Sequence, residues 1–335
     1  MRQILLLALL VVLSPPVSRA AKTLDMYAID TEGGKALLII APSGQSMLID
    51  TGYTGNNDRD LNRIVEAAKA AGVKKFDVLV TTHYDSDHVN NTPAVVSRIP
   101  AALFVDHGPA AFANDRMNKA VAAYLEVTAK AKRMVVKPGD KIPFKGIDVL
   151  VLTSNGEAIK TPLKGAGAPN SACADTPQKQ VDKSENGYSI GLLFTYGKFR
   201  MADFGDLSWN RELELMCPAN PVGTVDLFMV SYHGGDPANS PALIHGLRPR
   251  VTIMDNGVKK MGTASVLETI KTSPGLEAAY QLHWSINAPN TNPPDEFIAN
   301  LQNSTDGNPI KVSAQKNGVF MVTNTRTGTS KTFRK

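Results

Sequence analysis

The segment His83-Tyr84-Asp85-Ser86-Asp87-His88 concentrates metal-binding side chains in one short stretch of the chain. The 335 residues include six histidines, so two of them within this segment stand out. Its two carboxylates repel each other unless a cation lies nearby, and imidazole nitrogens and carboxylate oxygens are ligands for Zn, Mn and Fe. The segment therefore predicts a metal site, the alternative being a polar, solvated loop or a helix cap.

An apolar stretch with the composition of a strand, residues 76–80, leads directly into this segment. Apolar residues at helical spacing predict a helix over 60–71 before it, and a helix over 92–99 and a strand over 102–106 follow it. In α/β proteins with this alternation, loops at the carboxyl ends of strands commonly carry the site. We also expect strands at 24–29, 36–40, 47–50, 147–152, 189–195, 198–201, 225–230 and 250–254, helices at 114–132, 264–272 and 295–301, and a hairpin meander at 310–333.

These elements predict one α/β domain over residues 21–335, because strands and helices alternate in both halves of the chain. Residues 154–187 are rich in Gly, Pro, Ala and Lys and show no periodicity, so we expect a long irregular loop there. Cys173 and Cys217 are the two cysteines. In an exported protein such a pair can form a disulfide, and two unpaired thiols are the alternative.

Four segments occur in the order found in the metallo-β-lactamase superfamily. They are Leu48-Ile49-Asp50-Thr51-Gly52, Thr82 to His88, Phe204-Gly205-Asp206 and Tyr232-His233-Gly234-Gly235. Over residues 24–255 the chain most resembles the branch that contains the hydrolase domain of competence (DNA-uptake) channel proteins, which commonly has Asp at the position of Asp85. The resemblance implies a four-layer αβ/βα metallo-β-lactamase-like sandwich with a metal site at the edge of two sheets.

The same resemblance implies a role for each site residue. His83 and Asp85 would bind a first metal, Asp87, His88 and His233 a second, and Asp206 would bridge the two, while Asp50 would orient the ligand loop. Asp87 and Asp206 are the predicted catalytic residues. Two cations roughly 3.5–4 Å apart lower the pKa of a shared water and so provide an attacking group.

The chain departs from the superfamily pattern in three places. No histidine lies between His107 and His233, where most members have one; Asn186 and Ser189 match the Asn and Ser of the competence-like branch. Asn90-Asn91 replaces the usual Gly-Gly. Together with Asp85, these departures weaken the predicted first site, so one or two divalent ions are expected. Asp85 shifts the expected metal from Zn toward Mn or Fe.

Other polar residues are weaker candidates for contact with substrate. His107 follows a predicted strand and His283 lies in a late polar loop, and for each the alternative is a packed structural histidine. His245 lies in an apolar, helix-like stretch and is predicted to be structural. The pairs Lys259-Lys260 and Arg248/Arg250 could bind an anionic substrate, although such pairs more often form a solvated face.

The N-terminus has the pattern of a secretory signal over residues 1–20. Arg2 precedes an apolar run from Ile4 to Leu13, and Ser18-Arg19-Ala20 has small residues at the cleavage position. The run is shorter than the roughly 20 residues of a membrane-spanning helix, so we expect an exported, periplasmic or secreted protein without a stable membrane anchor; an uncleaved anchor is the alternative. Without Arg2 and Arg19, 34 basic residues face 31 acidic ones, a balance that does not indicate a nucleic-acid partner.

The function expected from these features is that of a metal-dependent hydrolase. Its substrate would be a small molecule or a phosphodiester; phosphodiesters, lactones and β-lactams are all substrates within the superfamily, and the competence-like resemblance favours the first. The alternative is a binding protein that kept the fold and lost catalysis. A di-iron redox enzyme is less compatible, because no glycine-rich flavin-binding fingerprint follows a strand.

Overall fold

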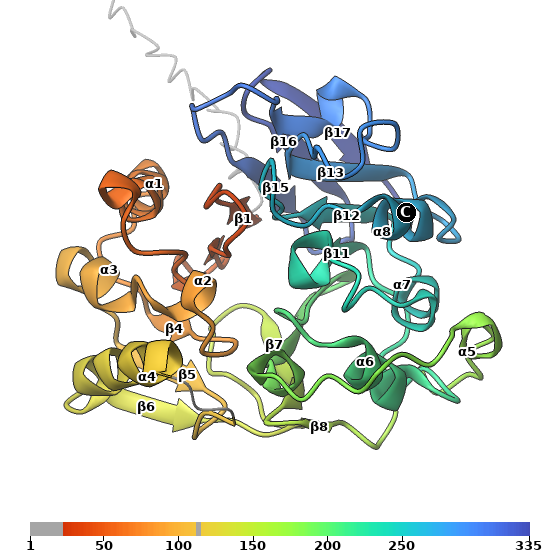
Figure 1. The fold of residues 1–335 in the computed structure, drawn as a ribbon, viewed down its shortest axis with the longest axis horizontal. Coiled ribbons are helices and arrows are strands. Elements are labelled where there is room, and N and C mark those ends of the chain that lie inside the picture. Colours follow the sequence, from red (N-terminus) through yellow and green to blue (C-terminus); the bar gives the residue numbers. More distant parts are fainter. Residues whose placement is uncertain (1–22, 112–114) are drawn as a thin grey trace, which may run out of the picture.

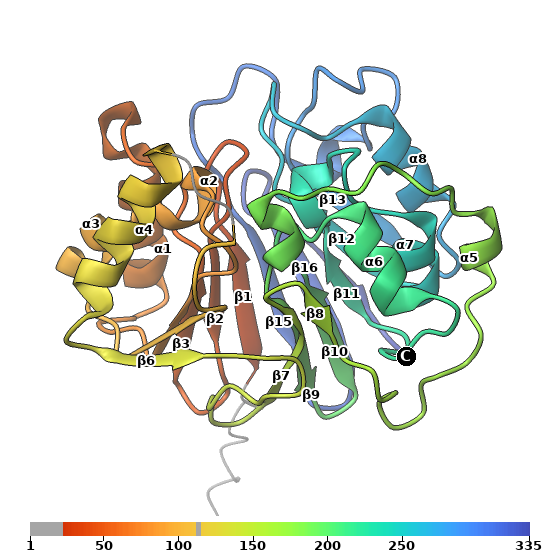
Figure 2. The same ribbon diagram turned by 60° about the horizontal axis from the view of Figure 1, so that its bottom comes forward.

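The computed structural model describes residues 23–111 and 115–335. The predicted signal segment, residues 1–20, lies outside the described residues. Two β-sheets pack face to face, and helices cover the outer face of each, so that the molecule has four layers (Figure 2). This is the predicted αβ/βα sandwich. Among the described residues, no helix has the length and apolar character needed to cross a bilayer.

The first sheet has nine strands and combines the two ends of the described chain. Its order is β17-β16-β15-β1-β2-β3-β4-β5-β6. The C-terminal strands thus return to pair beside β1, which Figure 1 shows as blue strands next to red ones. The bounds are β1 Leu24–Ala28, β2 Leu37–Ile40, β3 Ser46–Ile49, β4 Val78–Val80, β5 Leu103–Asp106, β6 Lys132–Val135, β15 Ile310–Ala314, β16 Phe320–Asn324 and β17 Thr329–Phe333.

The second sheet has eight strands in the order β14-β13-β12-β11-β10-β9-β7-β8. Strands β10 to β14 run parallel to one another, so their carboxyl ends lie at one edge of the sheet. The bounds are β7 Asp148–Ser154, β8 Glu157–Ala158, β9 Gly191–Tyr196, β10 Phe199–Asp203, β11 Leu227–Met229, β12 Val251–Met254, β13 Ala278–His283 and β14 Ile298–Asn300.

Helices lie on the two outer faces (Figure 2). The first sheet carries α1 Arg59–Ala70, α3 Thr92–Arg98 and α4 Asp115–Thr128, and the second carries α5 Ala172–Asp175, α6 Trp209–Met216, α7 Pro241–Leu247 and α8 Ala264–Lys271. The short helix α2, Ser86–Val89, and the 3-10 turns η1 Asn56–Asp58, η2 Glu185–Tyr188, η3 Ser231–Gly234 and η4 Asp295–Phe297 lie in connecting loops.

Apolar side chains on alternate positions of the strands build three contiguous cores. In β3, Met47 and Ile49 face the core between the sheets, whereas Leu48 faces the helices outside the first sheet. In β11, Leu227 and Met229 face the central core and Phe228 faces the helices outside the second sheet. Strands buried on both faces in this way are rigid supports for the loops at their ends.

Several predicted elements differ from the structure. The helix predicted over 295–301 is wrong: only η4 is helical, and Ile298–Asn300 forms β14, which pairs with β13. The helix predicted over 114–132 ends at Thr128, and β6 begins at Lys132. Helix α6 and strand β13 were not predicted. The long loop at 154–187 is largely irregular, as expected, and Cys173 and Cys217 form a disulfide that joins α5 to the end of α6.

Candidate metal centre

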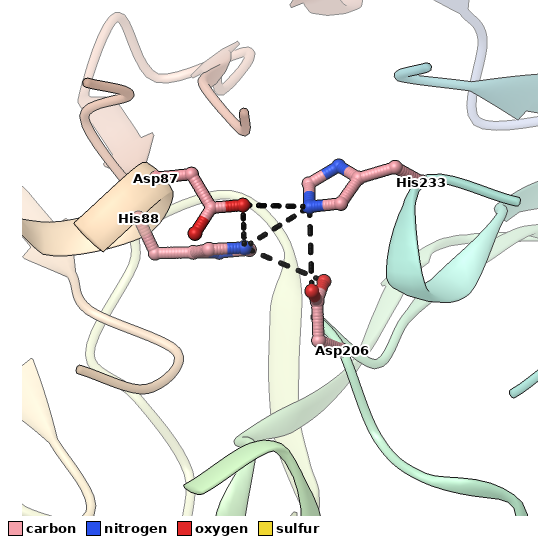
Figure 3. A group of neighbouring side chains, drawn as sticks. All are labelled: Asp87, His88, Asp206 and His233. Atoms are coloured by element: carbon pink, nitrogen blue, oxygen red, sulfur yellow. Dashed lines mark hydrogen bonds and ion pairs between the residues drawn. The ribbon is translucent and has the colours of Figure 1, made fainter. Parts of the chain in front are cut away.

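Four acidic and imidazole side chains from separate parts of the chain meet where the two sheets adjoin. Asp87 and His88 lie on α2, which follows β4; Asp206 follows β10; and His233 lies in η3, which follows β11. One ligand atom from each lies within 4.8 Å of the others. Figure 3 shows the four side chains pointing toward one another from opposite sides. The predicted convergence of these four residues therefore occurs.

The distances within this group of four are short. His233 Nε2 lies 3.2 Å from Asp87 Oδ2 and 3.3 Å from Asp206 Oδ2. His88 Nε2 lies 3.3 Å from His233 Nε2 and 3.4 Å from Asp206 Oδ1. All four residues are buried. Two nitrogens and two carboxylates thus face a common point from which most water is excluded.

Tight backbone turns bring Asp206 and His233 into place. Tyr232 and His233 have φ values of 52° and 53°, a left-handed conformation that non-glycine residues seldom adopt and that clusters at functional sites. Gly205 has a φ of 55°, and a Cβ atom there would lie 3.0 Å from Thr82. The glycine therefore lets the turn before Asp206 pass directly against the loop that carries His83 and His88.

Asp50 orients His88 from the end of β3. Its Oδ2 atom lies 2.8 Å from His88 Nδ1 and accepts a hydrogen bond of 2.6 Å from the Thr82 hydroxyl, while Oδ1 accepts from the Thr82 N–H at 2.8 Å. A carboxylate on Nδ1 favours the tautomer that leaves the Nε2 lone pair free. Asp50 therefore takes the position that the resemblance implied.

Asp255, which the sequence did not predict as a site residue, lies beside the outer ring nitrogen of His233 without a hydrogen bond to it. It follows β12, and its Oδ1 atom lies 3.3 Å from His233 Nδ1. Its Oδ2 atom lies 3.2 Å from the ammonium of Lys35, which in turn lies 3.1 Å from Asp203. The signal available was an aspartate directly after an apolar strand, the same arrangement that marks Asp50.

The electrostatics of the group favour a cation. Burial lowers the pKa of His88, but the charges of Asp206, Asp87 and Asp50 outweigh burial and raise this pKa to about 10. Burial also opposes ionisation of Asp206, yet His233 and His88 hold the pKa of its carboxyl well below its ordinary value. Ionised carboxylates thus surround the two imidazoles, and Asp206 Oδ1 has no hydrogen-bond partner. This donor set fits a divalent metal ion.

His83 and Asp85 lie beside the group of four rather than within it. The His83 ring centroid is 4.1 Å from that of His88, and His83 Nε2 is buried without a hydrogen-bond partner. Asp85 Oδ2 lies 3.7 Å from His83 Nε2, and about a third of its side chain is exposed. These two residues thus form a second pair of possible metal ligands next to the group of four, in which His83 is buried and Asp85 faces solvent.

The weaker candidates line the surroundings of the site or stabilise it. Asn186 donates to the Tyr232 hydroxyl at 3.2 Å, next to His233, and the buried Ser189 hydroxyl has no hydrogen-bond partner. His107 packs against Tyr84 and lies 2.7 Å from Glu185. His107 is therefore a packed histidine. Its partner Glu185 belongs to η2, so the contact fixes this turn beside the site.

His283 lies at the end of β13 rather than in a loop. Its Nε2 atom lies 2.7 Å from Asp30 Oδ1, and Asp30 also binds Arg63. This ion-paired arrangement gives His283 a structural partner in the β1–β2 turn. His245 lies in α7, as predicted, and contacts the Thr269 carbonyl.

The two basic pairs occupy different edges of the second sheet. Arg250 precedes β12, at the end opposite His233, and binds Glu277 at 2.6 Å. Arg248 and Arg250 are therefore remote from the group of four. Lys260, in contrast, contacts the Asp87 carboxylate and the Tyr53 hydroxyl.

Comparisons with known proteins agree with this architecture. Residues 30–169 match the family model described as the metallo-beta-lactamase superfamily. ComE operon protein 3 of Bacillus subtilis is 25% identical over 248 residues, which cover 70% of this chain and 28% of that protein. The chain thus spans about a quarter of the length of this relative.

Two solved structures align with much of the chain at low sequence identity. The metallo-beta-lactamase fold protein YhfI from Bacillus subtilis aligns with a TM-score of 0.49 and 11% identity, covering 78% of this chain and 96% of that one. CmlA, a diiron beta-hydroxylase from Streptomyces venezuelae, aligns with a TM-score of 0.44 and 11% identity, covering 77% and 52%. The family match over residues 30–169 and the two helix-covered sheets thus agree with the predicted resemblance to the metallo-beta-lactamase superfamily.

Proposed function

We propose that this protein is a metal-dependent hydrolase whose reaction takes place at the group of four. The observation that carries this proposal is the convergence of Asp87, His88, Asp206 and His233 within 4.8 Å of one another. A divalent cation held there would supply Lewis acidity and lower the pKa of a water that it binds. The protein would supply ligands, their orientation and a site largely closed to solvent.

Each ligand has a defined task in this proposal. Asp50 would hold His88 with Nε2 facing the cation, Asp255 would face the outer nitrogen of His233, and Asp206 would be a further ligand. Asp87 lies nearer the solvent, with 11% of its side chain exposed against 6% for Asp206. Asp87 is therefore the residue placed to accept a hydrogen bond from a water that approaches from outside.

The donor set limits the choice of metal. Two nitrogens and two carboxylates, without a thiolate, suit Zn, Mn or Fe. The group of four can hold one ion. His83 and Asp85 would be ligands for a second, with Asp206 as the bridge, which keeps one or two ions in the proposal.

A phosphodiester is the substrate that we favour over a lactone or a β-lactam. The ammonium of Lys260 lies at the Asp87 carboxylate, so the site offers positive charge to an anionic substrate. The resemblance to hydrolase domains of DNA-uptake proteins favours the same class, although the charge balance does not add support for nucleic acid as the partner. We further propose export to the periplasm or the medium, on the basis of the sequence pattern over residues 1–20.

A panel of three substrates tests this function. Purified protein with added Mn or Zn is assayed on bis-p-nitrophenyl phosphate, a chromogenic cephalosporin and a lactone. Asp206→Ala should abolish whichever hydrolysis is observed, whereas Asp148→Ala, at an exposed position on β7, should leave it unchanged. Persistence of the activity in Asp206→Ala would contradict the site. Metal binding without hydrolysis of any substrate would instead favour the alternative of a binding protein that has lost catalysis.

A further inference from the structure

Lys260 is the residue that connects the group of four to its solvent-facing side. Its ammonium contacts Asp87 Oδ2, the same oxygen that lies 3.2 Å from His233 Nε2. About 30% of the Lys260 side chain is exposed. Among the lysines and arginines that the structure describes, it is the one that forms an ion pair with a member of this group.

The backbone fixes Lys260 in this place. The Gly257 N–H donates to the Lys260 carbonyl at 3.0 Å, which closes a turn. A Cβ atom on Gly33 would lie 2.9 Å from the Lys260 Cβ, so the glycine allows the β1–β2 turn to pack directly against the lysine. The Tyr53 hydroxyl accepts a hydrogen bond from Nζ at 2.8 Å. The Lys260 ammonium thus has Tyr53 as a second partner beside Asp87.

A metal ion and this ammonium would compete for one carboxylate oxygen. Two positive charges on the same oxygen repel each other, and the repulsion is stronger where water is excluded. A cation bound by Asp87 would thus release Nζ from Oδ2. The ammonium would then lie at the solvent-facing side of the cation with Tyr53 as its remaining partner and hydrogen-bonding capacity to spare.

We propose that Lys260 exchanges partners on metal binding, leaving Asp87 to bind an anionic oxygen of the substrate. This inference rests on the proposed function, because it assigns the group of four to a metal. It has two linked consequences: Lys260 weakens metal binding, and it strengthens anion binding once the metal is present. A phosphodiester and a carboxylate-bearing lactam both offer such an oxygen, whereas a neutral lactone does not.

The experiment compares Lys260→Met with Lys259→Met. Lys259 is the exposed neighbour on the same loop, so the control removes the same charge from the same segment. Titration calorimetry measures binding of Mn²⁺ alone, then binding of inorganic phosphate to the Mn²⁺-loaded protein. In Lys260→Met we expect the Kd for Mn²⁺ to fall about tenfold and the Kd for phosphate to rise about tenfold, as for loss of one hydrogen bond to a charged group. Lys259→Met should change neither by more than about twofold.

Partner exchange predicts that the Kd for Mn²⁺ falls and the Kd for phosphate rises in the same variant, Lys260→Met. Unchanged or weaker Mn²⁺ binding in Lys260→Met would overturn the proposal, as would phosphate binding equal to that of the unmodified protein. If Lys260→Met does not fold, as judged by circular dichroism, Lys260→Gln replaces it. If the unmodified protein binds none of Mn²⁺, Zn²⁺ and Fe²⁺, both this inference and the proposed function are refuted. Binding without turnover of any substrate would refute the hydrolase alone. Turnover of bis-p-nitrophenyl phosphate but not the cephalosporin would identify the phosphodiester as the anion source.

Discussion

Replacing Lys35 by methionine tests whether buried ion pairs behind His233 stabilise the contact between the two sheets. Lys35 lies in the β1–β2 turn of the first sheet. Its ammonium lies 3.1 Å from Asp203, the last residue of β10, and 3.2 Å from Asp255, which follows β12. Lys35 and Asp203 have no more than 2% of their side chains exposed. Burial lowers the pKa of Lys35, but the two carboxylates outweigh burial and hold it above its ordinary value.

Removal of the ammonium leaves Asp203 buried without a counter-charge and Asp255 with His233 as its remaining ion-pair partner. Methionine keeps most of the apolar stem, so the cavity left behind is small and the loss is mainly electrostatic. Breaking a buried ion pair from one side costs about 3–5 kcal/mol. A domain is stabilised by only about 5–15 kcal/mol in total, so Lys35→Met should lose roughly a fifth or more of its free energy of unfolding.

The loss should depend on pH in a defined direction. Burial already raises the pKa of Asp203 despite its contact with Lys35, and removal of the lysine raises it further. The folded state then binds more protons than the unfolded chain, so the free energy of unfolding falls as the pH rises above the unfolded value of about 3.9. Lys35→Met should therefore be less destabilised at pH 5 than at pH 8.

Urea unfolding followed by far-UV circular dichroism measures this effect, with the disulfide left intact. Lys75→Met is the matched control: Lys75 is 53% exposed and lies 3.4 Å from Asp77, and such a surface pair contributes roughly 0–1 kcal/mol. Adding Asp203→Asn to Lys35→Met should restore part of the lost free energy of unfolding. The double-mutant cycle should give a coupling free energy of about 1–3 kcal/mol. A cost for Lys35→Met no greater than that for Lys75→Met at pH 8 would refute this reasoning.

Two further predictions concern the metal ligands and the disulfide. Asp50→Asn and Asp255→Asn should each weaken Mn²⁺ binding by about 10- to 100-fold, because an amide no longer fixes the tautomer of His88 or His233. Titration calorimetry measures the Kd for Mn²⁺. Full affinity in both variants would show that the two carboxylates do not orient the imidazoles. Cys173→Ser should lower the free energy of unfolding by roughly 4 kcal/mol, the loop-closure entropy expected for a bridge across 44 residues; an unchanged urea midpoint would show that the bridge does not restrict the unfolded chain.

Local signals predicted a site at Asp87 and His88, whereas Asp206 and His233 were added through the resemblance to the superfamily. Asp87 and His88 follow an apolar strand in a segment with few alternatives to metal binding. Asp206 and His233 each follow a strand, and β10 and β11 are parallel neighbours, so their carboxyl ends meet at one edge. The alternation of strands and helices predicted one α/β domain, since each sheet face needs a helix or another sheet to cover it; the four layers were implied by the resemblance.

Elements and contacts that depend on distant partners were not predictable in this way. Residues 295–301 have a helical composition, yet Ile298 pairs with Gln281 of β13, and this sheet register overrides local propensity. Lys35 follows two glycines in a turn and gives no sign of burial; its partner Asp255 lies 220 residues away in the sequence. Lys260 was distinguished from its neighbour Lys259 only by its contact with Asp87.

The geometry of the group of four depends on both sheets, because its residues come from loops at the ends of strands in each sheet. Asp50, which follows a strand of the first sheet, orients His88, and Asp255, which follows a strand of the second, lies 3.3 Å from His233 Nδ1. Metal binding tolerates deviations of only about 0.2 Å in ligand distance. The separation of the two imidazoles is set by the central core between the sheets and by the Lys35 ion pairs that cross the same boundary. Substitutions that shift one sheet against the other should therefore alter the metal site even where they contact no ligand.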